Sequence, residues 1–206
     1  MGNCIKYRPT AILIAINIAV YIYTSIIGGN ALNTNFAPNG TWLIVQYNAN
    51  VFNGAYWQLF TSMFVHASIA HIGGNMLFLL VFGLRGEEVF SLPEYLMAYL
   101  GGGVAGNLLS LLWGPSLVSV GASGAIFALF GAIVVFSRRS VRQSIIGALV
   151  YAFFLLFISS ASPEVNILAH LGGLGFGLIF GYLLGTRRKP HEQYSSKPSR
   201  SGMMPF

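Results

Sequence analysis

Ser123 and three histidines stand within or beside long apolar stretches of this 206-residue chain, where a buried polar group is costly. A serine hydroxyl is a weak nucleophile that needs a base within reach, and the imidazole of His170, with its near-neutral pKa, suits that role. The simpler alternative is a serine whose hydroxyl bonds a carbonyl one turn earlier in its own helix. A catalytic role for Ser123 therefore requires that the fold bring its hydroxyl and the His170 imidazole together.

Further polar groups could complete such a site. His71 and Asn75 are four residues apart and share one helix face. Attack of a hydroxyl on a carbonyl creates an oxyanion, for which His71, the Asn75 amide and the backbone N–H of Ser123 are possible donors. The sequence has no aspartate, which excludes a Ser-His-Asp triad. Packing must then orient the base, and Phe127, one turn after Ser123, can pack against the His170 ring.

The elements that would position these groups are membrane spans. The chain is 55% hydrophobic and only 8% charged, too little charge to cover the surface of a soluble domain of this length. Six apolar stretches approach the ~20 residues that cross a bilayer, so we expect an all-α polytopic membrane protein. The expected spans are about Thr10–Ile27, His71–Leu84, Tyr95–Trp113, Val118–Phe136, Ser144–Ile158 and Ile167–Leu184.

Charge placement predicts the orientation of these spans. All 11 basic residues precede the first span or follow the second, fourth or sixth. The positive-inside rule then places both termini in the cytoplasm, so the net charge of +6 indicates topology and no nucleic-acid partner. Spans two, four and six all begin at the outer face under this topology. Ser123, His170, His71 and Asn75 are therefore expected at one depth, about one turn below that face.

Small residues predict contact between the fourth and sixth spans. They recur every four residues, which lets two helix backbones approach closely. The sixth span carries Ala169, Gly173, Gly177, Gly181 and Gly185, and the fourth carries Gly124, Ala128 and Ala132. Helices meeting along these faces could bring Ser123 and His170 to a hydrogen-bond distance of ~3 Å. A packing groove without chemistry explains the same spacing, and spacing alone leaves both interpretations open.

Other classes of function fit the sequence less well. The pattern around Ser123 is not the Gly-x-Ser-x-Gly elbow of α/β-hydrolases, which also follows a strand. His66, His71 and His170 could bind zinc, but the chain has no His-Glu-x-x-His motif and no carboxylate within the spans. A transporter needs a polar path to the cytoplasmic side, and the inner halves of the last three spans are apolar. A single cysteine, Cys4, excludes an internal disulfide.

Two segments outside the spans have distinct compositions. Residues 28–65 contain no charge but many aromatic and asparagine residues, which suits a loop partly sunk in the interfacial layer. Residues 190–206 are polar and basic, which is typical of a disordered cytoplasmic tail. We therefore expect one core over residues 1–189, with no second domain.

Three motifs together resemble the rhomboid intramembrane serine proteases. They are Gly121-Ala-Ser123-Gly124 in the fourth span, Ala169-His170 with Gly173 and Gly177 in the sixth, and the His66, His71, Asn75 series in the second. Each is short, but their order, spans and depth match the family together. The resemblance covers about Thr10 to Gly185, including a six-helix topology and a long first outer loop.

The resemblance implies proteolysis within the membrane by a Ser-His dyad, without a cofactor or metal. Ser123 is then the nucleophile and His170 the general base. His71, Asn75 and the Ser123 N–H support the oxyanion, while Gly121, Gly124, His66 and Phe127 support the site.

The implied substrates are single-pass transmembrane proteins cut near the outer end of their helix, in a plasma membrane with the site open to the extracellular side. The implied gate is span five with its outer loop, residues 159–166. A non-catalytic relative that binds and guides membrane helices is the competing interpretation.

Two positions depart from the family pattern. The first outer loop of many rhomboids carries Trp-Arg, where this chain has Trp57-Gln58. The structural role of that arginine is therefore lost or replaced. The tyrosine often found one turn after the serine is Phe127 here, which can pack but cannot donate a hydrogen bond.

Overall fold

The computed structural model describes residues 8–30, 32, 40–140 and 165–187, which are mostly helical. Four helical segments among them are long and apolar enough to cross a membrane. They are α1 (Pro9–Gly28), α4 (Ile69–Val89), the run Leu92–Trp113 and α9 (Ile167–Arg187). The run Leu92–Trp113 joins α5 (Leu92–Leu96), a π-helical turn (Met97–Gly101), α6 (Gly102–Ser110) and a 3₁₀ turn (Leu111–Trp113). The protein is thus an all-α polytopic membrane protein, as its composition predicts.

The expected spans one, two, three and six coincide with these helices to within a few residues. The prediction for the fourth span was wrong at its start. Residues 118–122 are not helical: Val118–Ser119 form a short strand, β2, and α7 (Ser123–Ser140) begins at Ser123 itself. Ser123 therefore lies at the end of its helix and not one turn inside it. The expected fifth span, nearly all of the gate loop and the tail lie outside the described residues.

Local sequence explains where several helices begin and end. Pro9 opens α1, where its missing N–H costs nothing, and Gly29 closes it in the left-handed conformation with φ 67°. The Ser68 side chain accepts a hydrogen bond from the His71 N–H and caps α4. At α5, Ser91 and Glu94 form a reciprocal capping box. These caps satisfy backbone groups that the helix ends leave unpaired.

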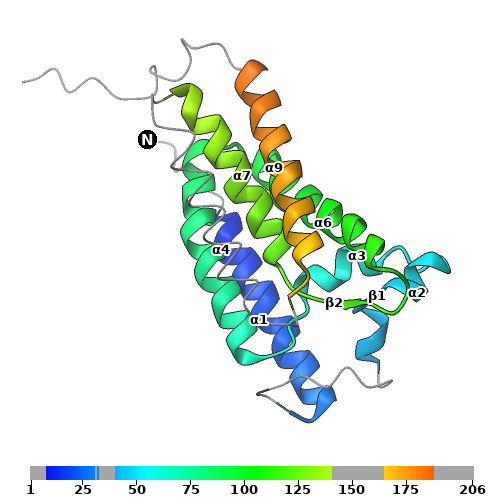
Figure 1. The fold of residues 1–206 in the computed structure, drawn as a ribbon. Helices are drawn as coiled ribbons and strands as arrows, with labels where there is room; N and C mark the ends of the chain where they lie inside the picture. The colour runs from blue at the N-terminus through cyan, green and yellow to red at the C-terminus, as the bar shows by residue number, and fades with distance from the viewer. Residues whose placement is uncertain (1–7, 31, 33–39, 141–164, 188–206) are drawn as a thin grey trace, which may run out of the picture.

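α7 lies at the centre of the helix bundle (Figure 1). It lies against α9, α6 and α4, and α1 packs on the far side of α4. Many large aliphatic side chains on the outer faces are exposed, as expected for helices that face lipid. Exposed examples are Ile12, Ile22, Leu80, Val81, Ile179 and Leu183.

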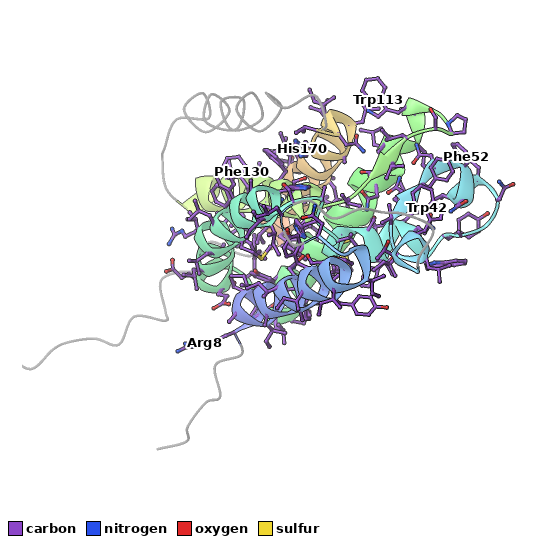
Figure 2. The ribbon with its side chains drawn as sticks, turned by 90° about the horizontal axis from the view of Figure 1, so that it is seen from below. Arg8, Trp42, Phe52, Trp113, Phe130 and His170 are labelled. Carbon is purple, nitrogen blue, oxygen red and sulfur yellow. The ribbon has the colours of Figure 1, made fainter. Side chains whose placement is uncertain are left out.

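A compact loop region lies beside this bundle, between α1 and α4 in the chain. It contains a 3₁₀ turn (Thr41–Leu43), β1 (Gln46–Tyr47), α2 (Asn48–Phe52), α3 (Gln58–Thr61) and a second 3₁₀ turn (Ser62–Phe64). In Figure 2 its Phe52 lies at the periphery with Trp113, whereas His170 lies among the helices. Phe52, Tyr56, Trp57 and Phe60 are exposed, which suits a loop in the interfacial layer.

β1 connects this loop region to the start of α7. It pairs antiparallel with β2, with Gln46 opposite Ser119 and Tyr47 opposite Val118. The buried Gln46 Nε2 lies 2.9 Å from Ser110 Oγ and 3.1 Å from the Asn107 carbonyl oxygen on α6. The segment that leads into Ser123 is therefore attached to α6 through β1.

Candidate active site

The structure brings Ser123 and His170 into direct contact. Ser123 is the first residue of α7, and His170 lies in the first turn of α9. The Ser123 Oγ and His170 Nε2 atoms are 2.7 Å apart, which is a short hydrogen bond. The structure thus brings the two side chains to the expected hydrogen-bond distance. The His170 side chain is buried, and Ser123 is half-buried.

The backbones of α7 and α9 touch along the predicted small-residue faces. A Cβ added at Gly173, Gly177 or Gly181 would collide with a backbone carbonyl of α7. The carbonyls concerned belong to Gly124, Ala128 and Ala132 respectively. Gly124 of α7 lies against the Ala169 carbonyl, so a larger residue at position 124 would push the two helices apart. The helices can approach this closely only because glycine and alanine line their contact.

Phe127 packs against the histidine ring. The ring centroids of Phe127 and His170 are 4.7 Å apart, with planes tilted by 36°. This contact restricts rotation of the imidazole while leaving its Nε2 directed at Ser123. No carboxylate appears among the described residues that line the site.

Gly121 lies beside His71 and has a backbone that favours glycine. Its φ is +123°, a conformation that residues with a side chain rarely adopt. A Cβ there would approach His71 Nε2 at 2.8 Å, which is closer than van der Waals contact allows. The Gly121 N–H donates to the Ser62 carbonyl at 3.0 Å, which anchors this turn to the loop region. The turn therefore places His71 next to the serine without an intervening side chain.

Asn75 and His66 extend the polar lining. The Asn75 Nδ2 group donates to the His71 carbonyl at 2.9 Å, which uses one of its two N–H bonds. His66 is fully buried, and its ring meets that of His71 edge to face at a centroid distance of 5.1 Å. Burial and the neighbouring His71 lower the pKa of His66 to about 3, so its ring is neutral at pH 7.

A cavity of about 500 Å³ opens onto these groups. Its walls come from α4, the turn before α7, α7 and the start of α9. Ser123, His170, His71, Asn75, Gly121 and Phe127 all line it, whereas Gly124 and His66 lie outside its lining. Beyond the polar end it is bounded by Phe78, Phe82, Ile126 and Phe130. A polar end that adjoins an apolar chamber suits an apolar peptide segment.

The described residues contain no group of three or more His, Cys, Asp or Glu side chains placed to hold a metal ion. The arrangement offers instead a hydroxyl, a base in contact with it, and donors around a space for a carbonyl. These are the parts that acyl transfer requires.

Two buried amide side chains support the loop, and one of them, Asn107, was not identified from the sequence. Gln58, which stands where the family resemblance leads us to expect arginine, is buried; it accepts from the Tyr47 N–H at 3.1 Å and donates to the Trp42 carbonyl at 3.2 Å. Gln58 therefore supports the loop through these two hydrogen bonds. Asn107 donates to the Leu59 carbonyl at 2.8 Å and to Ser62 Oγ at 3.0 Å. Its position inside an apolar span was a signal that could have found it.

Comparisons with known proteins give a consistent result. The Rhomboid domain family matches residues 53–187. The putative rhomboid protease YdcA of Bacillus subtilis is 34% identical over 154 residues, covering 71% of this chain and 76% of YdcA. RHOMBOID-like protein 1 of Arabidopsis thaliana is 36% identical over 136 residues, covering 64% of this chain. Rhomboid protease GluP of Bacillus subtilis is 29% identical over 180 residues, covering 85% of this chain. The matches span only 35% of RHOMBOID-like protein 1 and 34% of GluP.

Proposed function

Because the chain belongs to the rhomboid family, we propose that it is an intramembrane serine endopeptidase that uses Ser123 and His170 as a catalytic dyad. The observation that carries this proposal is the 2.7 Å contact between Ser123 Oγ and His170 Nε2 at the polar end of the cavity. A serine and a histidine that served only as each other's hydrogen-bond partners would need no cavity beside them. The relatives named as rhomboid proteases support the same activity.

The reaction follows from the positions of these groups. The Ser123 oxygen attacks the carbonyl carbon of the scissile peptide bond while His170 Nε2 takes the hydroxyl proton. The negative charge develops on the carbonyl oxygen, and its proposed donors are the His71 side chain, the second N–H of Asn75 and the Ser123 backbone N–H. The Ser123 N–H belongs to the first turn of α7, where helical N–H groups have no partner within the helix.

Breakdown of this intermediate releases the first product. His170 gives its proton to the departing amine, the peptide C–N bond breaks, and the acyl group stays on Ser123 as an ester. A water molecule then gives a proton to His170 and attacks the ester, and His170 passes this proton to the Ser123 oxygen as the acid leaves. No step needs a cofactor or a metal.

The proposed substrates are single-pass transmembrane proteins cut near the outer end of their helix. A peptide bond within a helix is shielded, so the substrate must unwind locally before Ser123 can reach it. The distribution of basic residues supports a topology with both termini in the cytoplasm and the dyad near the outer face of a plasma membrane. In this proposal residues 1–189 form the six-helix core, and residues 190–206 form a cytoplasmic tail. The partners are the substrate and the bilayer.

Reconstitution in liposomes tests this proposal. A panel of single-pass proteins is incubated with the wild-type chain and with Ser123→Ala, and the cut sites are mapped by mass spectrometry. We expect cleavage near the outer end of the substrate helix by the wild type and none by Ser123→Ala. Binding of transmembrane helices without any cleavage would favour the non-catalytic guide protein, and equal cleavage by both chains would exclude the dyad.

A further inference from the structure

A second hydrogen bond connects the two segments that carry the dyad. Asn166 Nδ2 donates to Ser119 Oγ at 2.8 Å. Asn166 lies four residues before His170, and Ser119 lies four residues before Ser123. The contact therefore joins the same two segments as the contact between Ser123 and His170, but four residues earlier in each segment. We call this Asn166–Ser119 hydrogen bond the clasp.

Both ends of the clasp are held by independent contacts. The Asn166 Oδ1 atom accepts from the Ala169 N–H at 3.1 Å, so the same side chain also caps α9. The Ser119 side chain is nearly buried, and its backbone pairs with Gln46 of β1. Gln46 is bonded to α6. The clasp thus attaches the first turn of α9 to the strand that leads into the serine.

The glycine contacts restrain the first residues of α9 less than the rest of the helix. Gly173, Gly177 and Gly181 hold α9 against α7 below His170, and the Ala169 carbonyl packs against Gly106 of α6 and Gly124 of α7. Before Ala169, the Asn166 side chain joins α9 to the strand that precedes α7. A helix end frays more readily than its interior, so a hydrogen bond at this end restrains the turn that carries His170.

We propose that Asn166 and Ser119 are positioning residues that hold His170 at the distance from Ser123 needed for proton transfer. This inference rests on the proposed function and adds to it the groups that replace the missing carboxylate of a triad. Neither residue touches the reacting atoms. The clasp fixes the first turn of α9, and the ring contact with Phe127 then fixes the imidazole. Proton transfer is sensitive to such placement, because a misplacement of about 1 Å can cost a factor of about 100 in rate.

A double-mutant cycle separates the clasp from the helix cap. Asn166→Ser keeps a good cap residue but is too short to reach Ser119 while capping, and Ser119→Ala leaves the cap untouched. We expect each single variant, and the double variant equally, to lower kcat about tenfold with little change in KM. Thr24→Ala is the matched control, because it removes a buried hydroxyl that bonds the Tyr21 carbonyl within α1, away from the dyad and from the contacts that hold the clasp. It should leave kcat within about twofold while lowering the melting temperature.

Hydrogen exchange gives a reading that does not depend on activity. The His170 N–H donates to the Asn166 carbonyl at 3.3 Å, so its exchange rate reports on the first turn of α9. We expect Ser119→Ala to raise this rate several-fold, while the amides around Gly177 keep their wild-type rates. If the wild-type chain cleaves nothing, the proposed function fails, and this exchange measurement still decides on the clasp. Unchanged exchange at His170, or losses in kcat that multiply in the double variant, would overturn the inference.

Discussion

The crossing of α7 and α9 and the loop region around β1 are both tightly packed, but they are stabilised in opposite ways. The crossing depends on residues without side chains: Gly173 and Gly177 of α9 let the carbonyls of Gly124 and Ala128 on α7 approach the α9 backbone. The loop is stabilised by buried amide side chains bonded to its backbone groups, Gln58 from the loop itself and Asn107 from α6. The crossing therefore sets a distance between helices, and the loop supplies hydrogen-bond partners to an irregular chain that has few of its own.

The two regions meet at the serine. The loop holds the Gly121 N–H through Ser62, and the crossing brings His170 to the same point. A defect in the crossing should move the base relative to the nucleophile. A defect in the loop should mainly lower stability, because its amides do not touch the dyad. The following predictions test that division, from the largest expected effect to the smallest.

Removal of the base itself should have the largest effect. We expect His170→Ala to lower kcat about 10⁴-fold, since serine then has no group to take its proton. The melting temperature should change by only a few degrees, because the glycine contacts of α9 remain. His191→Ala, in the polar C-terminal segment of the sequence, is the matched control and should cleave at the wild-type rate. A His170→Ala protein with more than a tenth of wild-type kcat would remove the histidine from the mechanism.

A methyl group in the crossing should have the next largest effect. In Gly177→Ala the new Cβ meets the Ala128 carbonyl, so the helices must separate and carry His170 away from Ser123. We expect kcat to fall about a hundredfold and stability to fall by about 1–3 kcal/mol. Gly175→Ala, on the same helix with no neighbour within 4 Å of the new methyl, should behave as wild type. Equal behaviour of the two variants would show that close backbone approach does not set the dyad distance.

A pair of amide variants contrasts the site with the loop. We expect Asn75→Ala to lower kcat about a hundredfold with little change in KM, because an oxyanion donor acts mainly in the transition state. Gln58→Ala should instead lower stability by about 1–3 kcal/mol, since it leaves the Tyr47 N–H and the Trp42 carbonyl without that partner. Steady-state kinetics and thermal unfolding measure the two effects. An unchanged kcat in Asn75→Ala would remove this amide from the oxyanion site.

Loss of the ring contact should have the smallest effect. Phe127→Leu keeps an apolar side chain beside His170 but loses the aromatic contact at 4.7 Å, so we expect kcat to fall about threefold to tenfold. Phe136→Leu is the matched control, since its ring meets Phe90 at the other end of α7. It should not change kcat. A larger loss for Phe136→Leu than for Phe127→Leu would contradict the role of packing in orienting the base.

The sequence predicts these two regions unequally, for a physical reason. Small residues at four-residue spacing predict the crossing, because backbone approach depends on side-chain size alone. The start of α7 was predicted too early, because an apolar run such as Val118–Val120 has the same composition in a strand as in a helix. The hydrogen bond from Gly121 to Ser62 and the pairing of β2 with β1 override that local pattern. The amide network of the loop could not be predicted in detail, because each partner comes from a distant part of the chain.

The clasp illustrates the same limit. Asn166 before an apolar run predicts a helix cap, and the structure has that cap. Nothing in the local pattern indicates that the same amide reaches Ser119, since that contact depends on where β2 lies. Long-range hydrogen bonds of single side chains are therefore the part of the site that only the coordinates reveal.

The most direct test of the dyad is covalent labelling of the serine. The wild-type protein, His170→Ala and Ser123→Ala are each treated with a fluorophosphonate probe, and the labelled peptide is identified by mass spectrometry. We predict a label on Ser123 in the wild type, a label at least a hundredfold slower in His170→Ala, and none on the 118–131 segment in Ser123→Ala. A wild-type protein that takes no label at Ser123, or takes it equally fast without His170, would contradict the account.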